Sequence, residues 1–362
     1  MRKLGLFLGF CLLCGLNTVY AAKNDKPAVR EQVLIYPSVD QHGDSLMLSG
    51  KVCVPLDQKP RGVILIPHYT ITSLRESPSI KMTGEAKTFK DEYVLLMPDY
   101  LGYGITGDRV HPYLDGDLTG HNCADMVLYA QKMADSLQIP IPMDSIYIVG
   151  YSQGGCTAAW TLRVIEEHFA DRIGVKGCFA GAGPYDVLVT FDEAIRTKKM
   201  TMPPLIAMVF VGTDVAYDLH LDRETMFTPK MKKRYEKYIA GKQYTQFQLF
   251  FKMMNSNLGH WLQPSVIDGT HPQVPLLREG LRRSSLVVAD SCPNWKPQAP
   301  LYVFHSTQDD VVSIQCAEHL QRCCPAEMPN VTYDFGKYGK HLQASSVFFR
   351  KVRALLDDQE AE

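Results

Sequence analysis

The chain lacks an excess of charge of either sign. Its 362 residues contain 38 Lys and Arg against 39 Asp and Glu, a formal net charge of -1. Such a balance gives no overall field that would draw the protein to nucleic acid or to anionic lipid. With 26 Gly, 22 Pro and a hydrophobic share of 46%, the composition also excludes collagenous, coiled-coil and disordered chains. A globular chain of one large domain or two modest ones remains.

The sequence has no apolar run long enough to span a bilayer. The apolar run near the amino terminus, Leu4 to Leu16, has 13 residues, whereas a membrane span needs about 20. Two basic residues precede this run and small residues ending at Ala21 follow it, which is the pattern of a signal peptide. We therefore expect cleavage of residues 1–21 and export to the periplasm or the medium. An uncleaved anchor, or a lipoprotein modified at Cys11 or Cys14, is the alternative.

The cysteines lack the spacing of a metal site. Cys323 and Cys324 are adjacent, and no histidine follows them at zinc-finger spacing. An exported protein can form disulfides, but a chain of this size does not need them, so disulfides and buried free thiols both remain open. We expect neither a metal nor a cofactor. The cysteines beyond residue 21 are Cys53, Cys123, Cys156, Cys178, Cys292, Cys316, Cys323 and Cys324.

Apolar runs of strand length alternate with helical patterns along most of the chain. Short, continuously apolar strands separated by helices predict a mainly parallel sheet covered on both faces, with antiparallel pairing among the first strands. The predicted strands are Val33–Tyr36, Leu46–Val54, Val63–Ile66, Tyr93–Met97, Ile146–Val149, Val175–Phe179, Leu301–Phe304 and Val331–Phe335. The predicted helices are Ala124–Leu137, Gly154–Phe169, Ile314–Cys323 and Leu342–Leu356.

This alternation stops between Tyr185 and Pro300. We interpret residues 185–300 as a cap inserted over the sheet, and residues 22–184 and 301–362 as the core. The insertion is rich in methionine and aromatic residues, most of which would form its own core while some face the site. A basic run between Lys230 and Lys237 is most simply a solvated helix face.

The clearest chemical signal is the segment Gly150–Gly155, which reads Gly-Tyr-Ser-Gln-Gly-Gly. A Gly-x-Ser-x-Gly match alone is weak, but here a buried strand precedes it and a helix follows it directly. Strand, sharp turn and helix form the setting of a nucleophile elbow. Side chains at Gly150 or Gly154 would collide with the neighbouring helix and strand. Ser152 is therefore the candidate nucleophile, and an incidental serine in a tight turn is the alternative.

A serine nucleophile needs a base and a group that orients the base. Asp309 lies on the loop after the strand Leu301–Phe304, at the carboxyl edge where α/β sheets collect functional residues. His341 lies on a glycine-containing loop after the next strand, just before the last helix. Along the chain the order is nucleophile Ser152, acid Asp309 and base His341. This is the order expected where the nucleophile lies on such an elbow. We expect Asp310 to face solvent or to cap the helix Ile314–Cys323.

With these residues in place, the chain resembles the α/β-hydrolase superfamily over nearly all of its mature length. The segments Met97–Gly104, His111–Tyr113 and Gly120–Asp125, together with the elbow, are most similar to bacterial secreted esterases related to secretory lipases. The resemblance implies an α/β-hydrolase fold, with a mostly parallel eight-stranded sheet and a helical cap. It also implies hydrolysis of carboxylic esters through an acyl-enzyme on Ser152.

The loop after the third strand departs from that family pattern. Many relatives have His-Gly at this point, whereas this chain has His68-Tyr69-Thr70. For the oxyanion we expect one donor from the backbone N–H of Gln153 and a second from the N–H of Thr70, with the Tyr69 hydroxyl as alternative.

Three function classes remain, of which a secreted esterase acting on a small-molecule ester is favoured. A serine peptidase of the prolyl-oligopeptidase branch is the runner-up, and a non-catalytic binding protein is the third. The sequence leaves the oligomeric state open. Other histidines have simpler roles: surface or helix packing for His319, structural hydrogen bonding for His305, capping or packing for His121, and solvent exposure, with substrate contact as the alternative, for His260 and His271.

Overall fold

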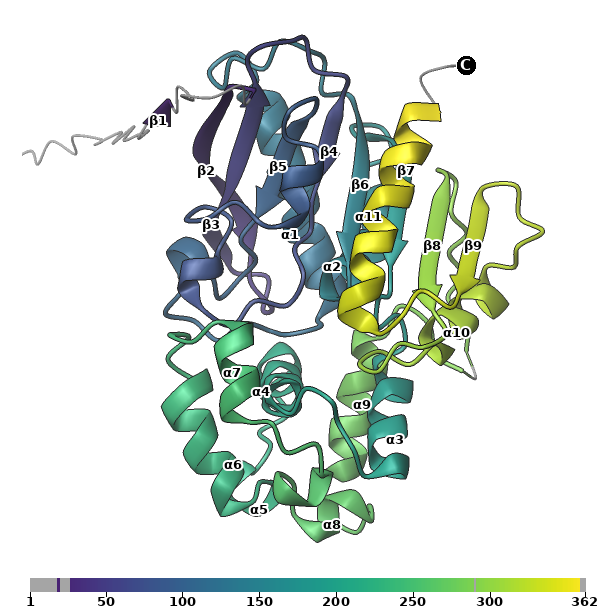
Figure 1. Cartoon of the computed structure of the whole chain (residues 1–362). Coiled ribbons are helices and arrows are strands. Elements are labelled where there is room, and N and C mark those ends of the chain that lie inside the picture. The colour runs from purple at the N-terminus through teal and green to yellow at the C-terminus, as the bar shows by residue number, and fades with distance from the viewer. Residues whose placement is uncertain (1–17, 20–26, 290, 359–362) are drawn as a thin grey trace, which may run out of the picture.

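A computed structural model describes residues 18–19, 27–289 and 291–358 of the chain (Figure 1). Most of the predicted signal peptide lies outside the described residues. The strands are β1 (Thr18–Val19), β2 (Val29–Val39), β3 (Ser45–Pro55), β4 (Val63–Leu65), β5 (Val94–Pro98), β6 (Ser145–Tyr151), β7 (Gly174–Gly181), β8 (Leu301–Ser306) and β9 (Val331–Gly336).

One sheet holds all of these strands, in the order β1-β2-β3-β5-β4-β6-β7-β8-β9. Strands β1, β2 and β3 pair in antiparallel fashion, and β3 is antiparallel to β5. From β5 through β9 every pairing is parallel. Strands β2 to β9 are the eight predicted strands, so the mostly parallel eight-stranded sheet is confirmed. Central strands such as β5 are buried at every position, because helices cover both faces.

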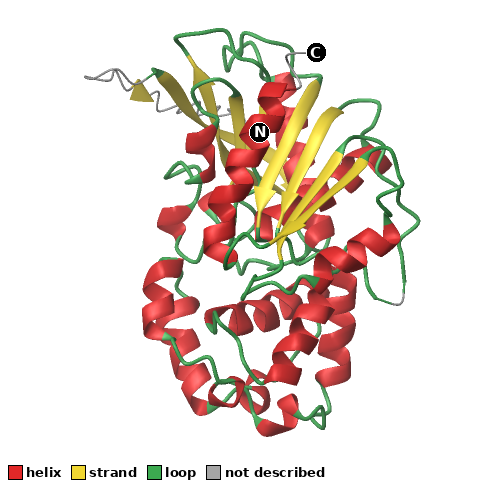
Figure 2. Cartoon of the chain, turned by 45° about the vertical axis from the view of Figure 1, so that its right-hand side comes forward, coloured by secondary structure: helices red, strands yellow, loops and turns green. Residues whose placement is uncertain are grey.

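Helices cover both faces of the sheet (Figures 1 and 2). One face packs against α1 (Gly116–Lys132), α2 (Gln153–His168) and α10 (Gln315–Cys323), and the other against α11 (His341–Asp358). Helix α1 differs from the predicted Ala124–Leu137, since it begins and ends earlier. Asp115 starts it by accepting a hydrogen bond from the N–H of Leu118. Gly116 and Gly120 of α1 allow close packing against Trp160 of α2.

The part of the chain that connects β7 to β8 forms a layer of helices, which lies below the sheet in Figure 2. We call residues 187–284 the helical insertion. Its α-helices are α3 (Val187–Thr197), α4 (Pro204–Tyr217), α5 (Arg223–Met226), α6 (Pro229–Arg234), α7 (Gln246–Lys252), α8 (Pro264–Ile267) and α9 (Val274–Ser284). Most of its apolar side chains pack on one another, including those of Phe227 and Trp261. The helical insertion therefore has a hydrophobic core distinct from the two cores on the faces of the sheet.

The two ends of the helical insertion are joined to each other and to the core. Val187 N–H donates to the hydroxyl of Ser285 at 2.9 Å, and Val287 N–H donates to the carbonyl of Tyr185 at 3.2 Å. At the other side of the insertion, the ammonium of Lys242 donates to the carbonyls of Gly102, at 2.5 Å, and Gly107, at 3.3 Å. These contacts hold the helical insertion against the loops that leave the sheet.

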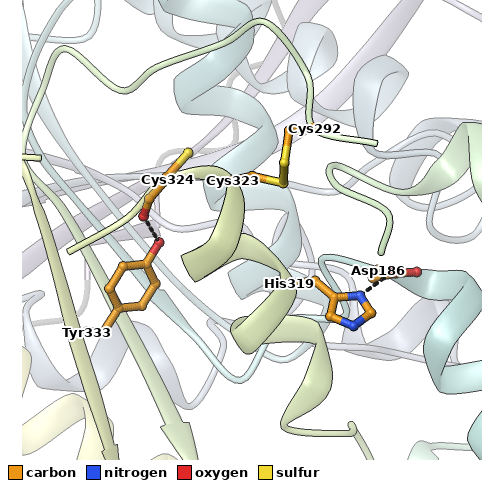
Figure 3. Close-up of a disulfide and its surroundings, with 6 residues drawn as sticks. All are labelled: Asp186, Cys292, His319, Cys323, Cys324 and Tyr333. Atoms are coloured by element: carbon orange, nitrogen blue, oxygen red, sulfur yellow. Dashed lines mark hydrogen bonds and ion pairs between the residues drawn. A yellow bond between two sulfur atoms is a disulfide. The ribbon is translucent and has the colours of Figure 1, made fainter. Parts of the chain in front are cut away.

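The cysteines divide between a disulfide and buried thiols. Cys292 and Cys323 form a disulfide, which joins the segment leaving the helical insertion to the end of α10 (Figure 3). The remaining cysteines within the described residues are free and buried: Cys53, Cys123, Cys156, Cys178, Cys316 and Cys324. Both of the possibilities that the sequence left open are therefore realised in one chain.

Candidate active site

Ser152 occupies a sharp turn between β6 and α2. Its backbone has φ 60° and ψ -123°, a strained conformation for a residue with a side chain, and its N–H donates to the Gly181 carbonyl at 2.8 Å. A Cβ at Gly150 would lie 2.1 Å from the Gly154 carbonyl oxygen, and one at Gly154 would lie 2.2 Å from that of Pro67. Both glycines are therefore required by the close approach of backbone segments, as the motif predicted.

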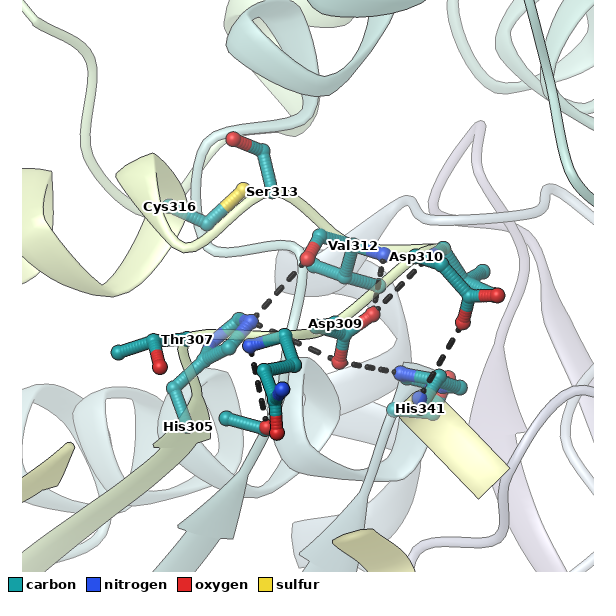
Figure 4. Close-up of polar contacts among 12 residues, drawn as sticks. His305, Thr307, Asp309, Asp310, Val312, Ser313, Cys316 and His341 are labelled. Carbon is teal, nitrogen blue, oxygen red and sulfur yellow. Dashed lines mark hydrogen bonds and ion pairs between the residues drawn. The ribbon is translucent and has the colours of Figure 1, made fainter. Parts of the chain in front are cut away.

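The structure brings the three predicted residues together. His341 Nε2 lies 2.9 Å from Ser152 Oγ, and His341 Nδ1 lies 2.6 Å from Asp309 Oδ2. The other carboxylate oxygen, Asp309 Oδ1, accepts the N–H groups of Val311 and Val312 at 2.9 Å each (Figure 4). Because Nδ1 faces a carboxylate, His341 carries its proton there in the neutral form and presents Nε2 to the serine as an acceptor.

The surroundings keep Asp309 ionised. Burial raises the pKa of this carboxyl, but the hydrogen bond with His341, the electrostatic interactions with the His341 and His305 rings and the Val311 N–H outweigh it, so the pKa lies below its ordinary value. His305 is fully buried with Nε2 3.1 Å from the Val312 carbonyl and 3.7 Å from Asp309 Oδ2. Burial lowers the pKa of His305. His305 thus has the structural hydrogen-bonding position expected of it.

Asp310 takes a position that the sequence did not predict. We expected it to face solvent or to cap α10, but its Oδ1 accepts the backbone N–H of His341 at 3.3 Å. It also forms an ion pair with Lys340 at 3.3 Å. Asp310 therefore supports the start of α11, because the first N–H groups of a helix have no partner within the helix.

Contacts between distant segments hold the histidine loop. The Tyr151 hydroxyl donates to the His341 carbonyl at 2.7 Å, and the Ser306 hydroxyl donates to the Gly339 carbonyl at 2.5 Å. Gly339 N–H in turn donates to the side-chain oxygen of Gln308 at 3.2 Å. The sequence did not predict these residues, since nothing local to a tyrosine or serine indicates a partner in a distant loop.

Gln153, the residue after the serine, is fixed by a buried histidine. Its side-chain amide lies 2.9 Å from Nε2 of His111, whose Nδ1 lies 2.7 Å from the Leu101 carbonyl. Burial lowers the pKa of His111 to about 3, so the ring is neutral. A neutral ring that donates from Nδ1 must accept at Nε2, hence the amide NH2 of Gln153 is the donor. This contact orients the first turn of α2.

The predicted oxyanion loop, His68 to Thr70, packs against the elbow. A Cβ at Gly154 would lie 3.0 Å from the backbone carbon of His68. His68 Nδ1 lies 2.6 Å from the Tyr69 carbonyl, and its ring stacks on that of Tyr100 with centroids 3.9 Å apart. The Thr70 hydroxyl hydrogen-bonds the hydroxyl of Tyr113 at 2.7 Å. The loop thus lies beside the first turn of α2, on a support of buried aromatic rings.

Two cavities meet at Ser152. The first, of about 510 Å³, lies between the elbow and the helical insertion, and its walls include Val187, Phe191, Met200, Ile206, Val209, Phe210, Leu258 and Leu262. The second, of about 660 Å³, lies toward α11, and its walls include Tyr69, Glu85, Thr88, Tyr151, Gln246, His341 and Arg350. Met202 and Leu205 line both cavities. An ester held at Ser152 would have space on either side of its carbonyl.

The remaining histidines lie away from these cavities. His319 is buried, with Nδ1 2.6 Å from the Asp186 carboxylate (Figure 3). His121 packs beside His168 at 5.1 Å between ring centroids. The expected exposure of His271 is wrong, because the residue is buried with Nε2 3.0 Å from the Thr225 hydroxyl. His260 packs on a neighbouring ring, Trp261, at 4.7 Å.

Comparison with known proteins identifies the family. The model of the secretory lipase family matches residues 79–349. This chain belongs to that family. No curated protein matches the sequence.

Solved structures of esterases and lipases share the fold. LipA, a rice cell wall degrading esterase from Xanthomonas oryzae, superposes with a TM-score of 0.76 and 21% identity, over 92% of this chain and 90% of that one. Candida antarctica lipase A in its closed state gives a TM-score of 0.66 and 16% identity, over 88% and 74%. This secretory lipase family member is a carboxylic ester hydrolase with an α/β-hydrolase fold.

The described residues offer neither a metal site nor a membrane-spanning helix. In residues 18–19, 27–289 and 291–358, no group of three or more His, Cys, Asp or Glu side chains could hold a metal ion. None of the helices described there is long and apolar enough to cross a bilayer.

Proposed function

We propose that this secretory lipase family member hydrolyses esters by covalent catalysis, with Ser152 as nucleophile, His341 as general base and Asp309 as the group that orients the base. The observation that carries the proposal is the unbroken contact from Asp309 through His341 to Ser152, at 2.6 and 2.9 Å. A serine hydroxyl is a poor nucleophile without such a base.

In the first step, Ser152 Oγ attacks the ester carbonyl while His341 Nε2 accepts its proton. Asp309 stabilises the positively charged ring that results, and holds its tautomer. His341 then gives the proton to the departing alkoxide, which leaves as the alcohol and leaves the acyl group on Ser152. A water molecule, deprotonated by the same histidine, attacks the acyl-enzyme and releases the carboxylic acid, with the proton returned to Ser152.

The tetrahedral intermediate carries its negative charge on the former carbonyl oxygen. We assign one donor to the backbone N–H of Gln153, which begins α2 next to the nucleophile. The second donor is the backbone N–H of Thr70, with the Tyr69 hydroxyl as alternative, because this loop packs against Gly154 of the elbow. Loss of one such donor costs roughly 3 kcal/mol in the barrier.

The substrates we propose are short-to-medium acyl or aromatic esters, with the helical insertion acting as a cap. The first cavity has mainly apolar walls, whose burial of acyl carbon supplies about 25 cal/mol per Å². A peptidase needs fixed charges for a substrate terminus. Glu193 of the helical insertion lines the first cavity, but it is paired with Arg196 at 2.6 Å. Four other acidic residues of the insertion line neither cavity: Asp214, Asp218, Asp222 and Glu224.

We also propose that the enzyme is exported and acts outside the cytoplasm. The proposal rests on the signal-peptide pattern of residues 1–21 and on membership of the secretory lipase family. Amino-terminal sequencing of the protein recovered from the producing cells tests it, and an intact Met1 terminus would contradict cleavage after Ala21.

A fluorophosphonate label followed by an ester and amide series tests the proposed reaction. The label should attach to Ser152, as read by mass spectrometry of the digested protein. Among p-nitrophenyl esters of increasing acyl length, aromatic esters and dipeptidyl amides, the highest kcat/KM should belong to an ester. A dipeptidyl amide that exceeds the best ester would overturn the assignment in favour of a peptidase.

Narrowing the first cavity should shorten the acyl chain that the enzyme accepts. Val209 is half-buried on α4 and lines only this cavity. In Val209→Phe we expect kcat/KM for the longest accepted acyl ester to fall about tenfold relative to the acetyl ester, since one or two lost methylene contacts are worth about 1–3 kcal/mol. Ser346→Phe, in the second cavity, is the matched control and should leave the acyl-length preference unchanged. The opposite result would place the acyl group in the second cavity.

A further inference from the structure

Glu85 is a buried carboxyl without a hydrogen-bond partner in the described part of the chain. It begins the short 3-10 helix η2 (Glu85–Thr88), and 4% of its surface is exposed. Both of its carboxyl oxygens, and the neighbouring hydroxyl of Thr83, are buried and unpaired. An isolated buried carboxyl lowers the stability of a fold, so its presence beside a reactive site calls for a role in that site.

The carboxyl lies between the second cavity and the oxyanion loop. Glu85 and Tyr69 line this cavity together with Ser152 and His341. The backbone N–H of Tyr69 and the hydroxyl of Thr83 lie close enough to lower the pKa of Glu85, although neither completes a hydrogen bond of normal geometry. Glu85 is thus the acidic side chain that faces the backbone of the loop.

Other residues hold the loop at its remaining polar groups. His68 binds the Tyr69 carbonyl and Tyr113 binds the Thr70 hydroxyl. Glu85 faces the N–H of Tyr69. We propose that Glu85 is a positioning residue, which supports the backbone at Tyr69 and thereby places the Thr70 N–H for the oxyanion. The proposal rests on the oxyanion donors assigned above and adds a residue that acts through them.

The protonation state of Glu85 gives the proposal a signature. Burial raises the pKa of this carboxyl to about 8, against the weaker effects of Tyr69 N–H and the Thr83 hydroxyl. Its titratable neighbours are the phenols of Tyr69 and Tyr100, and burial raises the pKa of each, that of Tyr69 to about 12. From α11, His341 and Arg350 line the same cavity. A pKa of about 8 makes the neutral, protonated form of Glu85 the major one at pH 7.

A neutral carboxyl puts no negative charge beside the place where the oxyanion forms. Above about pH 8 the carboxylate would repel that oxyanion, and kcat should fall. The repulsion should lower kcat and leave KM nearly unchanged, because it is strongest in the transition state.

Two substitutions separate support of the loop from charge. Glu85→Gln keeps a side-chain oxygen near Tyr69 N–H and cannot ionise, so kcat at pH 7 should stay within about threefold of wild type while the alkaline fall disappears. Glu85→Leu removes the polar group that faces Tyr69 N–H, and we expect kcat to drop about a hundredfold with little change in KM, the cost of a misplaced oxyanion donor. A folded Glu85→Leu protein with wild-type kcat, or an alkaline fall that survives in Glu85→Gln, would overturn the proposal.

Glu76→Gln is the matched control. Glu76 is a partly buried carboxyl that also acts on Tyr69, but it accepts the N–H groups of Thr72 and Ser73 and does not line the cavity. This variant should retain the alkaline fall, and its loss here would contradict the assignment to Glu85. Fluorophosphonate labelling separates failure of the proposed function from failure of this inference. If wild-type enzyme is not labelled at Ser152, both are overturned. If labelling is normal but kcat of Glu85→Leu equals that of wild type, only the inference is overturned.

Thermal unfolding provides a readout independent of activity. The folded-state pKa of Glu85 is raised from 4.5 to about 8, so folding takes up a proton between these values and stability falls as pH rises through that window. Glu85→Gln lacks this loss. Its Tm should exceed that of wild type by a margin that grows from about pH 5 to pH 8 and then stays constant. A margin independent of pH would show that Glu85 is ionised throughout, which contradicts the proposal.

Discussion

Ser152→Ala should lower kcat about a millionfold and abolish fluorophosphonate labelling, as expected when the nucleophile of a serine hydrolase is removed. The variant should fold normally, because the change deletes one oxygen and leaves the backbone contacts of the elbow in place. Those contacts include the hydrogen bond from Ser152 N–H to the Gly181 carbonyl. Hydrolysis of the best model ester and mass spectrometry of the labelled protein measure the effect, with circular dichroism as the test of folding.

Ser345→Ala is the matched control for this experiment. Ser345 lines the second cavity on α11, where its hydroxyl donates to the Leu342 carbonyl at 2.8 Å. It has no histidine beside it among the hydrogen bonds of the described residues, so it should be no nucleophile, and its alanine variant should label like wild type. Labelling that persists in Ser152→Ala would move the nucleophile elsewhere.

Asp309→Asn should lower kcat about ten-thousandfold, the effect of a wrong histidine tautomer in an enzyme of this type. The amide NH2 of asparagine would face His341 Nδ1 as a donor, or its oxygen would lose the charge that stabilises the protonated ring. KM should change little, because Asp309 is buried behind the histidine and contributes mainly in the transition state. Steady-state kinetics on one ester gives both constants.

Asp310→Asn provides the comparison, since Asp310 is the neighbouring carboxylate. Its structural contact is with the backbone N–H of His341, which the oxygen of an asparagine can still accept. We therefore expect kcat to fall no more than about tenfold, from loss of the ion pair with Lys340 and a slight shift of α11. A larger loss in Asp310→Asn than in Asp309→Asn would mean that Asp310 is the orienting group.

The sheet could be predicted from the sequence because its strands are short apolar runs whose signal is local. Each predicted run falls within or beside one of β2 to β9. The predicted bounds of helix α1 are wrong: it begins at Gly116, after the cap Asp115, and its glycines Gly116 and Gly120 fit against Trp160 of another helix, a contact that the local sequence does not show. The helices of the insertion were not placed individually, since their apolar residues face several directions within one small core.

In the candidate site, too, residues marked by a local sequence pattern could be predicted, and residues defined by long-range contacts could not. Ser152, Asp309 and His341 could be proposed because each follows a strand of recognisable pattern and the three occur in a specific order. The supporting contacts could not, since Tyr151 with His341 and Ser306 with Gly339 join segments far apart in sequence. Glu85 was missed for a related reason: a glutamate at the start of a helical turn is ordinarily solvated, and only the fold shows that it is buried.

The junctions of the helical insertion allow substrate choice and chemistry to diverge separately. The insertion leaves the core after Tyr185 and returns at Ser285 and Val287, where backbone and side-chain hydrogen bonds bring the two crossing points together. A homologous segment of different size could replace the helical insertion at these two crossing points. The turn that holds Ser152 and the loop that holds Asp309 would stay unchanged. During evolution or in protein engineering, exchange of the helical insertion could thus change substrate specificity while the catalytic residues stay the same.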